Sequence, residues 1–144
     1  MLLSKTCEYA IRAMIYIAQQ SSKGNRVGIK DIAANIESPE YFMAKILQDL
    51  SRKGFVQSVK GPNGGFYMDE EHTRITLADI VRAIDGDQLF TGCGLGLKEC
   101  SATHPCPIHH RFGAIRNNIK KMLEESIVAM FVDSLELNLT FLKK

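Results

Sequence analysis

The segment 29–68 constrains the fold more than any other part of this 144-residue chain, because two helical patterns and a hairpin pattern follow one another there. A short helix is predicted over about Ile29–Ile36, with isoleucines recurring on one side. A polar break follows, in which Ser38 suits an N-cap and the next residue is a proline, preferred at the first helical position. A second helix is predicted from there to about Lys53, ending at Gly54. Two helices joined by so short a turn predict a helix-turn-helix.

The second helix separates its side chains into two arcs on a helical wheel. The apolar arc predicts the buried side and comprises Phe42, Met43, Ile46, Leu47 and Leu50. The opposite arc comprises Tyr41, Ala44, Lys45, Gln48 and Arg52. Its amide, ammonium and guanidinium groups can donate hydrogen bonds to base edges or phosphates, and its small alanine lets the helix approach a thymine methyl. This composition suits a DNA recognition helix, and a simple solvated helix face is the alternative interpretation.

A β-hairpin is predicted directly after this helix. Residues 55–60 alternate in the manner of a strand, 61–65 form a glycine-rich turn, and 66–68 suit the returning strand. A hairpin in this position is the wing of a winged helix, and its glycines allow the backbone to approach phosphates or enter a minor groove. An ordinary surface hairpin is the alternative. The residues predicted to contact DNA are Ser38, Tyr41, Ala44, Lys45, Gln48, Arg52, Lys60, Pro62 and Asn63.

Two more helices flank this unit. The first is predicted from about Ser4 to Gln20, with Ser4 as its cap. Glu8 lies in its first turn, where a solvated carboxylate stabilises the helix dipole without any further role. Thr76 and Asp79 form a capping-box pair at the start of the other helix, which is predicted to end at residues 85–87.

A cysteine-rich stretch follows, with neither helical nor strand periodicity. Thiolates are soft donors that suit iron-sulfur clusters, zinc and copper(I). A four-ligand set would comprise Cys93, Cys100, Cys106 and His109. The intervals between these residues are six, five and two residues, mostly longer than in structural zinc sites, and they favour a loop wrapped around something larger than one ion. Three reduced cysteines in an ordinary loop are the alternative.

Length and composition indicate one domain, or one small domain with an appendage. No apolar run is long enough to span a bilayer, and charges interrupt the first apolar residues, which argues against a signal peptide. We therefore expect a cytoplasmic protein with no membrane partner, in which clustered cysteines bind metal or sense redox state rather than form disulfides. The formal net charge of +2 is too small to establish a nucleic-acid partner by itself.

A long helix is predicted from about Pro107 to Glu125, and a last helix after Ser126 that reaches Leu139. The apolar positions of the long helix are Ile108, Phe112, Ile115, Ile119, Met122 and Leu123. Such a stripe is often ordinary core. Because the helix is long and few other elements remain to cover it, we favour the two-fold seam of a homodimer.

The chain resembles the family of bacterial winged-helix transcriptional regulators that includes IscR, NsrR and CymR, the Rrf/BadM type. The resemblance covers nearly the whole chain and rests on four motifs. They are Tyr9-Ala10 in the first helix, Phe42-Met43-Ala44-Lys45-Ile46-Leu47 with Leu50 and Arg52-Lys53-Gly54 in the recognition helix, Val59-Lys60-Gly61-Pro62-Asn63-Gly64-Gly65-Phe66 in the wing, and Cys106-Pro107-Ile108-His109 at the end of the cysteine loop. The wing and cysteine motifs together are specific.

The resemblance implies a cytosolic homodimer that binds an inverted-repeat operator in double-stranded DNA. It makes Cys93, Cys100 and Cys106 ligands of an iron-sulfur cluster, of either the 2Fe-2S or the 4Fe-4S type. The fourth ligand differs among members of the family. It is either a histidine after the last cysteine, here His109, or an acidic residue of the first helix, here Glu8, which the partner subunit can donate. We favour His109, and we expect the cluster to sense nitric oxide, redox state or iron-sulfur status.

The sequence thus predicts a mostly α-helical fold with a small β-hairpin wing. A winged helix-turn-helix DNA-binding domain is expected over residues 1–86, a cluster-binding loop over 87–106, and a dimerisation helix with a C-terminal helix over 107–144. Two other functions stay open. In one, the loop carries zinc or no metal, and a partner protein or small ligand controls the regulator. In the other, the chain is an iron-sulfur electron carrier or thiol enzyme, which the lack of a CxxC pair among the loop cysteines disfavours.

Overall fold

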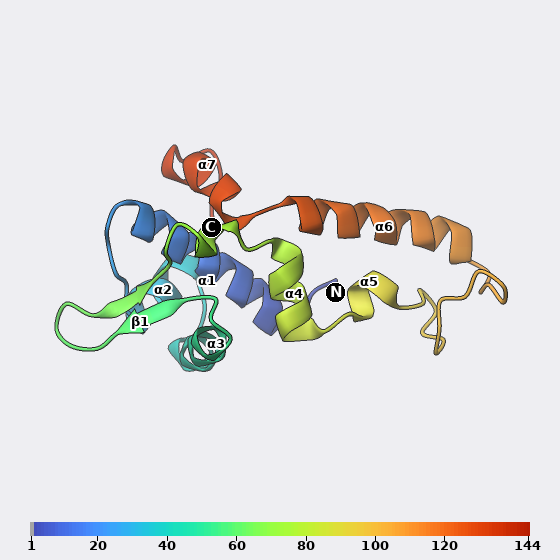
Figure 1. Cartoon of the computed structure of the whole chain (residues 1–144), viewed down its shortest axis with the longest axis horizontal. Coiled ribbons are helices and arrows are strands. Elements are labelled where there is room, and N and C mark those ends of the chain that lie inside the picture. The colour runs from blue at the N-terminus through green and yellow to red at the C-terminus, as the bar shows by residue number, and fades with distance from the viewer. Residues whose placement is uncertain (1) are drawn as a thin grey trace.

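The computed structural model describes residues 2–144 and is mainly helical, with one two-stranded antiparallel sheet in that range (Figure 1). Its α-helices are α1 (Lys5–Ser22), α2 (Ile29–Ile36), α3 (Glu40–Arg52), α4 (Leu77–Asp85), α5 (Gln88–Thr91), α6 (His109–Glu125) and α7 (Val132–Glu136). Its strands are β1 (Gln57–Val59) and β2 (Gly65–Tyr67), and its 3-10 helices are η1 (His72–Arg74) and η2 (Val128–Phe131). The predicted order of a first helix, a helix-turn-helix and a hairpin is therefore confirmed.

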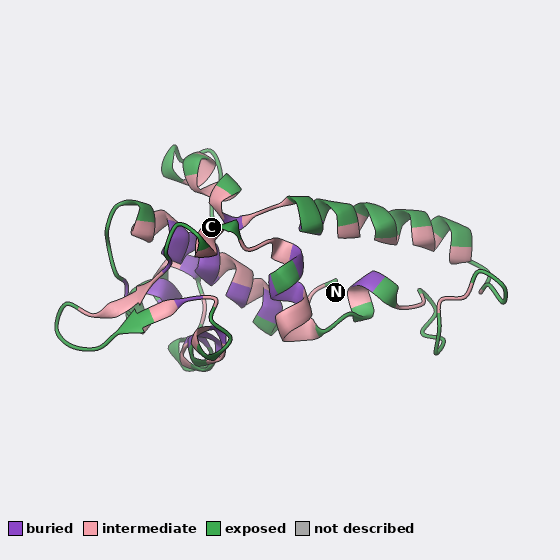
Figure 2. Cartoon of the chain, viewed as in Figure 1, coloured by how far each residue is buried: buried purple, intermediate pink, exposed green. Residues whose placement is uncertain are grey.

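Helix α1 is the centre of the main hydrophobic core (Figure 2). Its fully buried residues include Ala10, Ala13, Met14 and Ile17. Helices α2, α3 and α4 and the C-terminal segment pack around it. Two polar contacts fix α2 against it: the Tyr16 hydroxyl donates to Asp31 at 3.0 Å, and the Arg12 guanidinium donates to the carbonyl of Ile36 at 2.9 Å. Helix α1 is thus the scaffold that orients the helix-turn-helix.

The turn between α2 and α3 differs from the prediction at Ser38. Glu37 adopts a left-handed conformation with a φ of 55° at the end of α2, and the Ser38 amide donates to the carbonyl of Ala33 at 3.0 Å. Because its amide closes α2, Ser38 belongs to the end of that helix. Pro39 takes the N-cap position of α3, without a side-chain cap bond. The predicted serine cap is therefore wrong, and the buried Ser38 hydroxyl has no hydrogen-bond partner within residues 2–144.

Phe42 is a second difference on this helix. Its neighbours on the apolar arc are buried as predicted, but Phe42 is 48% exposed. The residue lies where the start of α3 meets α1, and its ring centroid is 6.4 Å from that of Tyr9 and 5.9 Å from that of Tyr41. Phe42 therefore belongs to an aromatic edge beside the recognition face rather than to the core.

The wing is a short antiparallel hairpin of β1 and β2. A third segment joins it, since the Val27 amide donates to Phe66 at 3.1 Å and the Phe66 amide donates back at 2.7 Å. The turn requires glycine at position 64, because a Cβ on Gly64 would lie 2.0 Å from the carbonyl oxygen of Val59. Gly65 has a φ of 139°, and a Cβ there would meet the backbone of Val27. These contacts hold the wing against the segment that precedes α2.

The predicted capping box at the start of α4 is confirmed. The Thr76 hydroxyl accepts from the Asp79 amide at 3.0 Å, and the Asp79 carboxylate accepts from the Thr76 amide at 3.1 Å. Thr76→Ala is expected to lower the free energy of unfolding by about 1 kcal/mol, because a helix amide loses its acceptor. Urea unfolding followed by circular dichroism measures the change, and Thr76→Ser, which keeps the hydroxyl, is the matched control. An equal loss in both variants would contradict this role of the hydroxyl.

The predicted cysteine loop over 87–106 begins with a helix, α5, that the sequence did not predict. Phe90 on α5 is 4% exposed and belongs to a second, smaller core. The other buried members of that core are Cys7, Ala78, Val81 and Leu123. Arg82 covers the Phe90 ring, with its Cζ 4.3 Å from the ring centroid, and forms ion pairs with Asp87 at 3.3 Å and Glu124 at 3.2 Å. One side chain therefore joins α4, α5 and α6.

The segment after α6 departs furthest from the prediction. The Leu77 amide donates to the carbonyl of Ser126 at 2.8 Å, and the Val128 amide donates to that of Ile75 at 2.9 Å. The predicted helix after Ser126 is confirmed only in part: η2 continues directly into α7, and helical structure ends at Glu136, before Leu139. Asn138 has a left-handed conformation, with a φ of 57°, just after that end. Val128 is fully buried in the α1 core, so this segment packs with the N-terminal unit.

Candidate nucleic-acid interface and cysteine-loop metal centre

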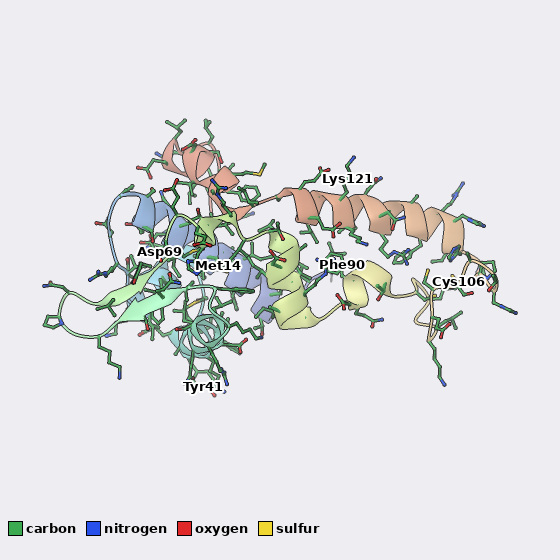
Figure 3. The ribbon with its side chains drawn as sticks, viewed as in Figure 1. Met14, Tyr41, Asp69, Phe90, Cys106 and Lys121 are labelled. Carbon is green, nitrogen blue, oxygen red and sulfur yellow. The ribbon has the colours of Figure 1, made fainter. Side chains whose placement is uncertain are left out.

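The predicted recognition face of α3 lies on the side of the helix opposite its buried residues and is open to solvent. Tyr41, Lys45, Gln48 and Arg52 are exposed, and Ala44 is half-buried. Figure 3 shows Tyr41 on the side of α3 that faces away from the core. The Lys45 ammonium lies 4.6 Å from the centroid of the Tyr41 ring, a cation–π contact that orients both side chains.

At the end of α3, ion pairs with Asp49 orient Arg52 and Lys53, and one hydrogen bond from Lys53 connects this end to α4. The Lys53 ammonium donates to the Asp49 carboxylate at 2.9 Å and to the carbonyl of Ala83 at 2.7 Å. Arg52 reaches the same carboxylate at 3.5 Å, with its side chain 74% exposed. Because exposed pairs of this kind contribute little to stability, the Arg52 guanidinium stays available to a phosphate.

The wing tip lies at the end of the molecule that carries α3 (Figure 1). Lys60, Pro62 and Asn63 are exposed there. Sequence reasoning missed one cation, the exposed Arg26, whose Cζ lies 5.3 Å from the centroid of the Tyr67 ring in β2. The pairing of the segment before α2 with the wing brings Arg26 to this place. No local pattern signals such a long-range pairing, so the sequence alone could not reveal it.

The cysteine loop brings the predicted ligands together as two pairs. The Cys100 sulfur lies 3.4 Å from Nδ1 of His109, the first residue of α6. The thiols of Cys93 and Cys106 lie close enough that each shifts the pKa of the other, lowering that of Cys93 and raising that of Cys106. All three cysteines are free and half-buried. A donor set of three thiols and one imidazole fits an iron-sulfur cluster.

The local surroundings shift the pKa values of Cys93, Cys106 and Cys7 in different ways. The Leu95 amide, 3.4 Å from the Cys93 sulfur, makes the largest contribution to a lowered pKa of Cys93. Desolvation raises the pKa of Cys106, and the contact with Cys93 raises it further. Burial, reinforced by the nearby Asp85 carboxylate, raises the pKa of Cys7 to about 12. Cys7 is therefore a protonated thiol near neutral pH, and the loop cysteines are the metal-binding candidates.

The alternative ligand Glu8 lies in α1 and pairs with Lys5 at 3.6 Å. Its side chain is 30% exposed, and no hydrogen bond or ion pair within residues 2–144 joins it to the loop. In the same range, no three side chains of His, Cys, Asp or Glu converge closely enough to hold a single metal ion. The four candidate ligands of the loop and α6 therefore form two separate pairs and do not surround one shared position.

The recognition face and the cysteine loop lie at opposite ends of the molecule (Figure 3). Figure 3 labels Tyr41 near one end and Cys106 near the other, with α4, α5 and α6 between them. Arg82 joins the three helices of this middle region to one another, and a separate contact connects α4 to α1. The Asp85 carboxylate, at the end of α4, accepts from both the amide and the hydroxyl of Ser4, the residue that caps α1. Through α4, α5 and α6, these contacts join the cysteine loop to α1, the scaffold of the helix-turn-helix.

Comparison with known proteins identifies the family. The family model Rrf2, described as an iron-dependent transcriptional regulator, matches residues 3–134. The chain belongs to the Rrf2 family. A relative from Aquifex aeolicus, named an HTH-type transcriptional regulator, is 32% identical over 130 residues, which are 89% of each chain. The HTH-type transcriptional regulator NsrR of Geobacillus kaustophilus is 29% identical over 104 residues, which cover 72% of this chain and 65% of NsrR.

Solved structures share the fold of this Rrf2 chain. CymR, the global cysteine regulator of B. subtilis, has a TM-score of 0.72 at 21% identity, covering 91% of this chain and 95% of CymR. IscR of T. potens has a TM-score of 0.70 at 22% identity, covering 96% and 90% of the two chains. The predicted mostly helical winged-helix fold is confirmed.

The Rrf2 assignment also settles the class of function. The chain is a transcriptional regulator and not an enzyme, since the family and its curated relatives regulate transcription. No helix within residues 2–144 is long and apolar enough to cross a membrane.

Proposed function

We propose that this Rrf2-family regulator binds an inverted-repeat operator as a homodimer in the cytoplasm, and that an iron-sulfur cluster in its cysteine loop controls that binding. The observation that carries the proposal is that three thiols of the loop and the imidazole of His109, at the adjoining start of α6, lie near one another as two donor pairs. That loop is joined through α4, α5 and α6 to the scaffold of the helix-turn-helix.

The chemistry of α3 and the wing supports DNA binding. Lysine contacts guanine edges or phosphates, and glutamine pairs with adenine, so Lys45 and Gln48 suit direct readout in a major groove. Lys60 at the wing tip and Arg26 beside Tyr67 of β2 suit contacts with the phosphate backbone. The exposed side chains of α3 and the wing tip lie at the same end of the molecule, as a winged helix requires.

The exposed side of α6 supports the homodimer. Ile108, Ile115 and Met122 recur at intervals of seven residues and are 39%, 59% and 53% exposed. Along the adjacent edge of the same stripe, Leu123 is buried and Ile119 packs against the second core. The predicted apolar stripe therefore divides into a covered part and an uncovered part, and a seven-residue repeat on the uncovered part suits a paired helix.

The donor set supports the cluster. Cys93, Cys100, Cys106 and His109 would hold it, with Glu8 of the partner subunit as the alternative to His109. When bound, the group supplies a redox-active centre that reacts with oxygen or nitric oxide. Because the ligands come from the loop and from the first residue of α6, their spacing fixes how α5 meets α6. Arg82 and the contact between Ser4 and Asp85 then transmit the position of α5 relative to α6 to α1, and so to the recognition helices of the two subunits.

The experiment that tests this function compares Cys100→Ala with wild type, both purified without oxygen. Wild type is expected to contain iron and acid-labile sulfide in matching amounts, with absorption from thiolate-to-iron charge transfer. Cys100→Ala is expected to lose both, because one of four ligands is gone. Operator affinity of wild type should change on exposure to nitric oxide or air, and that of the variant should not respond. Cys7→Ala is the matched control, and it should keep iron and sulfide because Cys7 lies outside the loop.

Other outcomes decide against the cluster. Zinc, or no metal in any of the three proteins, leaves a winged-helix regulator controlled by a partner protein or small ligand. Equal operator binding by Cys100→Ala and wild type, with and without nitric oxide, would reject the coupling even if iron is present.

A further inference from the structure

Arg116 on α6 is a charged residue that the proposed function does not yet use. Its Nη1 donates to the Cys100 sulfur at 3.0 Å and to the carbonyl oxygen of Gly92 at 3.3 Å. The residue is half-buried, its Nε is buried without a partner, and no ion pair within residues 2–144 includes it. A guanidinium turned inward toward a sulfur, rather than outward toward a carboxylate, is not the arrangement of an ordinary surface arginine.

The position of Arg116 on α6 places it beside the predicted ligand His109. The two residues are seven positions apart, which is close to two full turns, so they share one face of the helix. Nδ1 of His109 lies 3.4 Å from the Cys100 sulfur and Nη1 of Arg116 lies 3.0 Å from it. Two side chains of α6 therefore hold the same thiol, one as a candidate ligand and one as a hydrogen-bond donor.

The loop is also close to α6 at a second point. A Cβ on Gly94 would lie 2.7 Å from the ring of Phe112, which is one turn before Arg116. The loop backbone thus approaches α6 at Gly94, while Arg116 fixes it on either side of that point, at Gly92 and Cys100. The loop is seated on the helix by contacts of the chain itself.

We propose that Arg116 is a positioning residue that seats the cysteine loop on α6 and, through its N–H···S bond to Cys100, sets the reduction potential of the bound cluster. The second half of this inference rests on the proposed function, whereas the first half does not. Hydrogen bonds to ligating sulfurs, and positive charge beside them, favour the reduced and more negative state of a cluster. Arg116 therefore makes the cluster easier to reduce and places Cys100 before any ligand binds.

The first test measures loop seating without metal. Hydrogen–deuterium exchange of the chelator-treated full chain is compared in wild type, Arg116→Ala and Arg116→Lys. Arg116→Ala is expected to exchange several-fold faster over residues 92–100, because both hydrogen bonds from Nη1 to the loop are lost. Arg116→Lys keeps a charge and a donor but not the planar fork, and should lie between the two. Arg111→Ala, an exposed arginine on the same helix, is the control and should match wild type.

The second test measures the potential of the same proteins with their cluster, by anaerobic dye titration followed in the visible spectrum. Arg116→Ala should move the midpoint to a more negative value and Arg116→Lys should restore part of the shift, with iron and sulfide per chain unchanged. A role confined to loop packing would leave the midpoint in place and overturn the second half of the proposal. Unchanged exchange in Arg116→Ala overturns the first half. If wild type binds no iron, the proposed function fails while the exchange experiment still decides the seating role.

Discussion

Lys45→Glu is expected to lower the affinity for the operator by roughly 100-fold or more. A side-chain contact with a base edge contributes about 1–3 kcal/mol. A symmetric dimer loses that contact in both half-sites, so removal alone is expected to weaken binding by about 2–6 kcal/mol. The new carboxylate also repels the phosphates. Folding should be unaffected, because Lys45 is exposed and its one described partner is the ring of Tyr41.

Fluorescence anisotropy with the duplex that wild type selects from a random pool measures this effect at fixed salt. Lys121→Glu is the matched control, because it makes the same charge change on α6, where Lys121 is 72% exposed and points away from the body (Figure 3). Lys45→Ala adds a diagnostic. If Lys45 contacts a phosphate, the plot of log affinity against log salt should be less steep for Lys45→Ala than for wild type, by about 2 in the magnitude of the slope per dimer. Equal losses in the two glutamate variants would mean that net charge, not the α3 face, governs binding.

Local signals in the sequence predicted most of the DNA-binding half. The Thr76 and Asp79 pair marks a helix start because both partners lie within one turn. The glycines of the wing mark the hairpin because position 64 leaves no room for a Cβ. The helical wheel of α3 predicted its buried face, but it misplaced Phe42, since a wheel describes one helix and not where its neighbours end.

Long-range contacts account for what the sequence did not predict. The pairing of Val27 with Phe66, which brings Arg26 to the wing, joins segments with no shared periodicity. Helix α5 forms because Phe90 finds a core made by α1, α4 and α6, and four residues carry too little pattern to show it. At the cysteine loop, residue type and spacing predicted the thiols and His109 as candidate ligands. They could not identify Arg116, because only the fold of the loop against α6 brings its guanidinium to Cys100.

The two ends of the molecule are linked by the second core, in which Cys7 of α1 packs with residues of α4, α5 and α6, and by polar contacts at the end of α4. Arg82 contacts all three helices of the middle region, and Asp85 ties the end of α4 to the cap of α1. Both residues lie within the last turn of α4, just before the chain enters the cysteine loop. In the proposed function, we expect a change in the way α5 meets α6 to act first on the end of α4, and through Ser4 on the start of α1. The Ala83 carbonyl, at the same end of α4, accepts a hydrogen bond from Lys53, the residue that follows the recognition helix.

Removal of residues 127–144 is expected to abolish cooperative folding of the DNA-binding half. The sequence divides the chain at residue 86, but Val128 is fully buried among α1 residues, and further side chains of this segment pack on the same core. They are Phe131, Val132, Leu135 and Leu142. Full burial of one such side chain contributes about 1.5–3 kcal/mol. Their joint loss is then comparable with the roughly 5–15 kcal/mol that stabilises a typical domain.

Point variants test the same role without the risk that a truncated chain aggregates. Val128→Ala removes two buried methyl groups and leaves a cavity, so the free energy of unfolding should fall by about 2 kcal/mol. Leu139→Ala, at a residue 70% exposed in the same segment, should change it by less than about 0.5 kcal/mol. Urea unfolding followed by circular dichroism measures both. If the truncated chain unfolds cooperatively with a wild-type midpoint, the C-terminal segment is an appendage. If Val128→Ala is destabilised as expected, the C-terminal segment anchors the C-terminal end of α6 in the DNA-binding unit. Helix α6 is then fixed to that unit at one end and joined to the cysteine loop at the other.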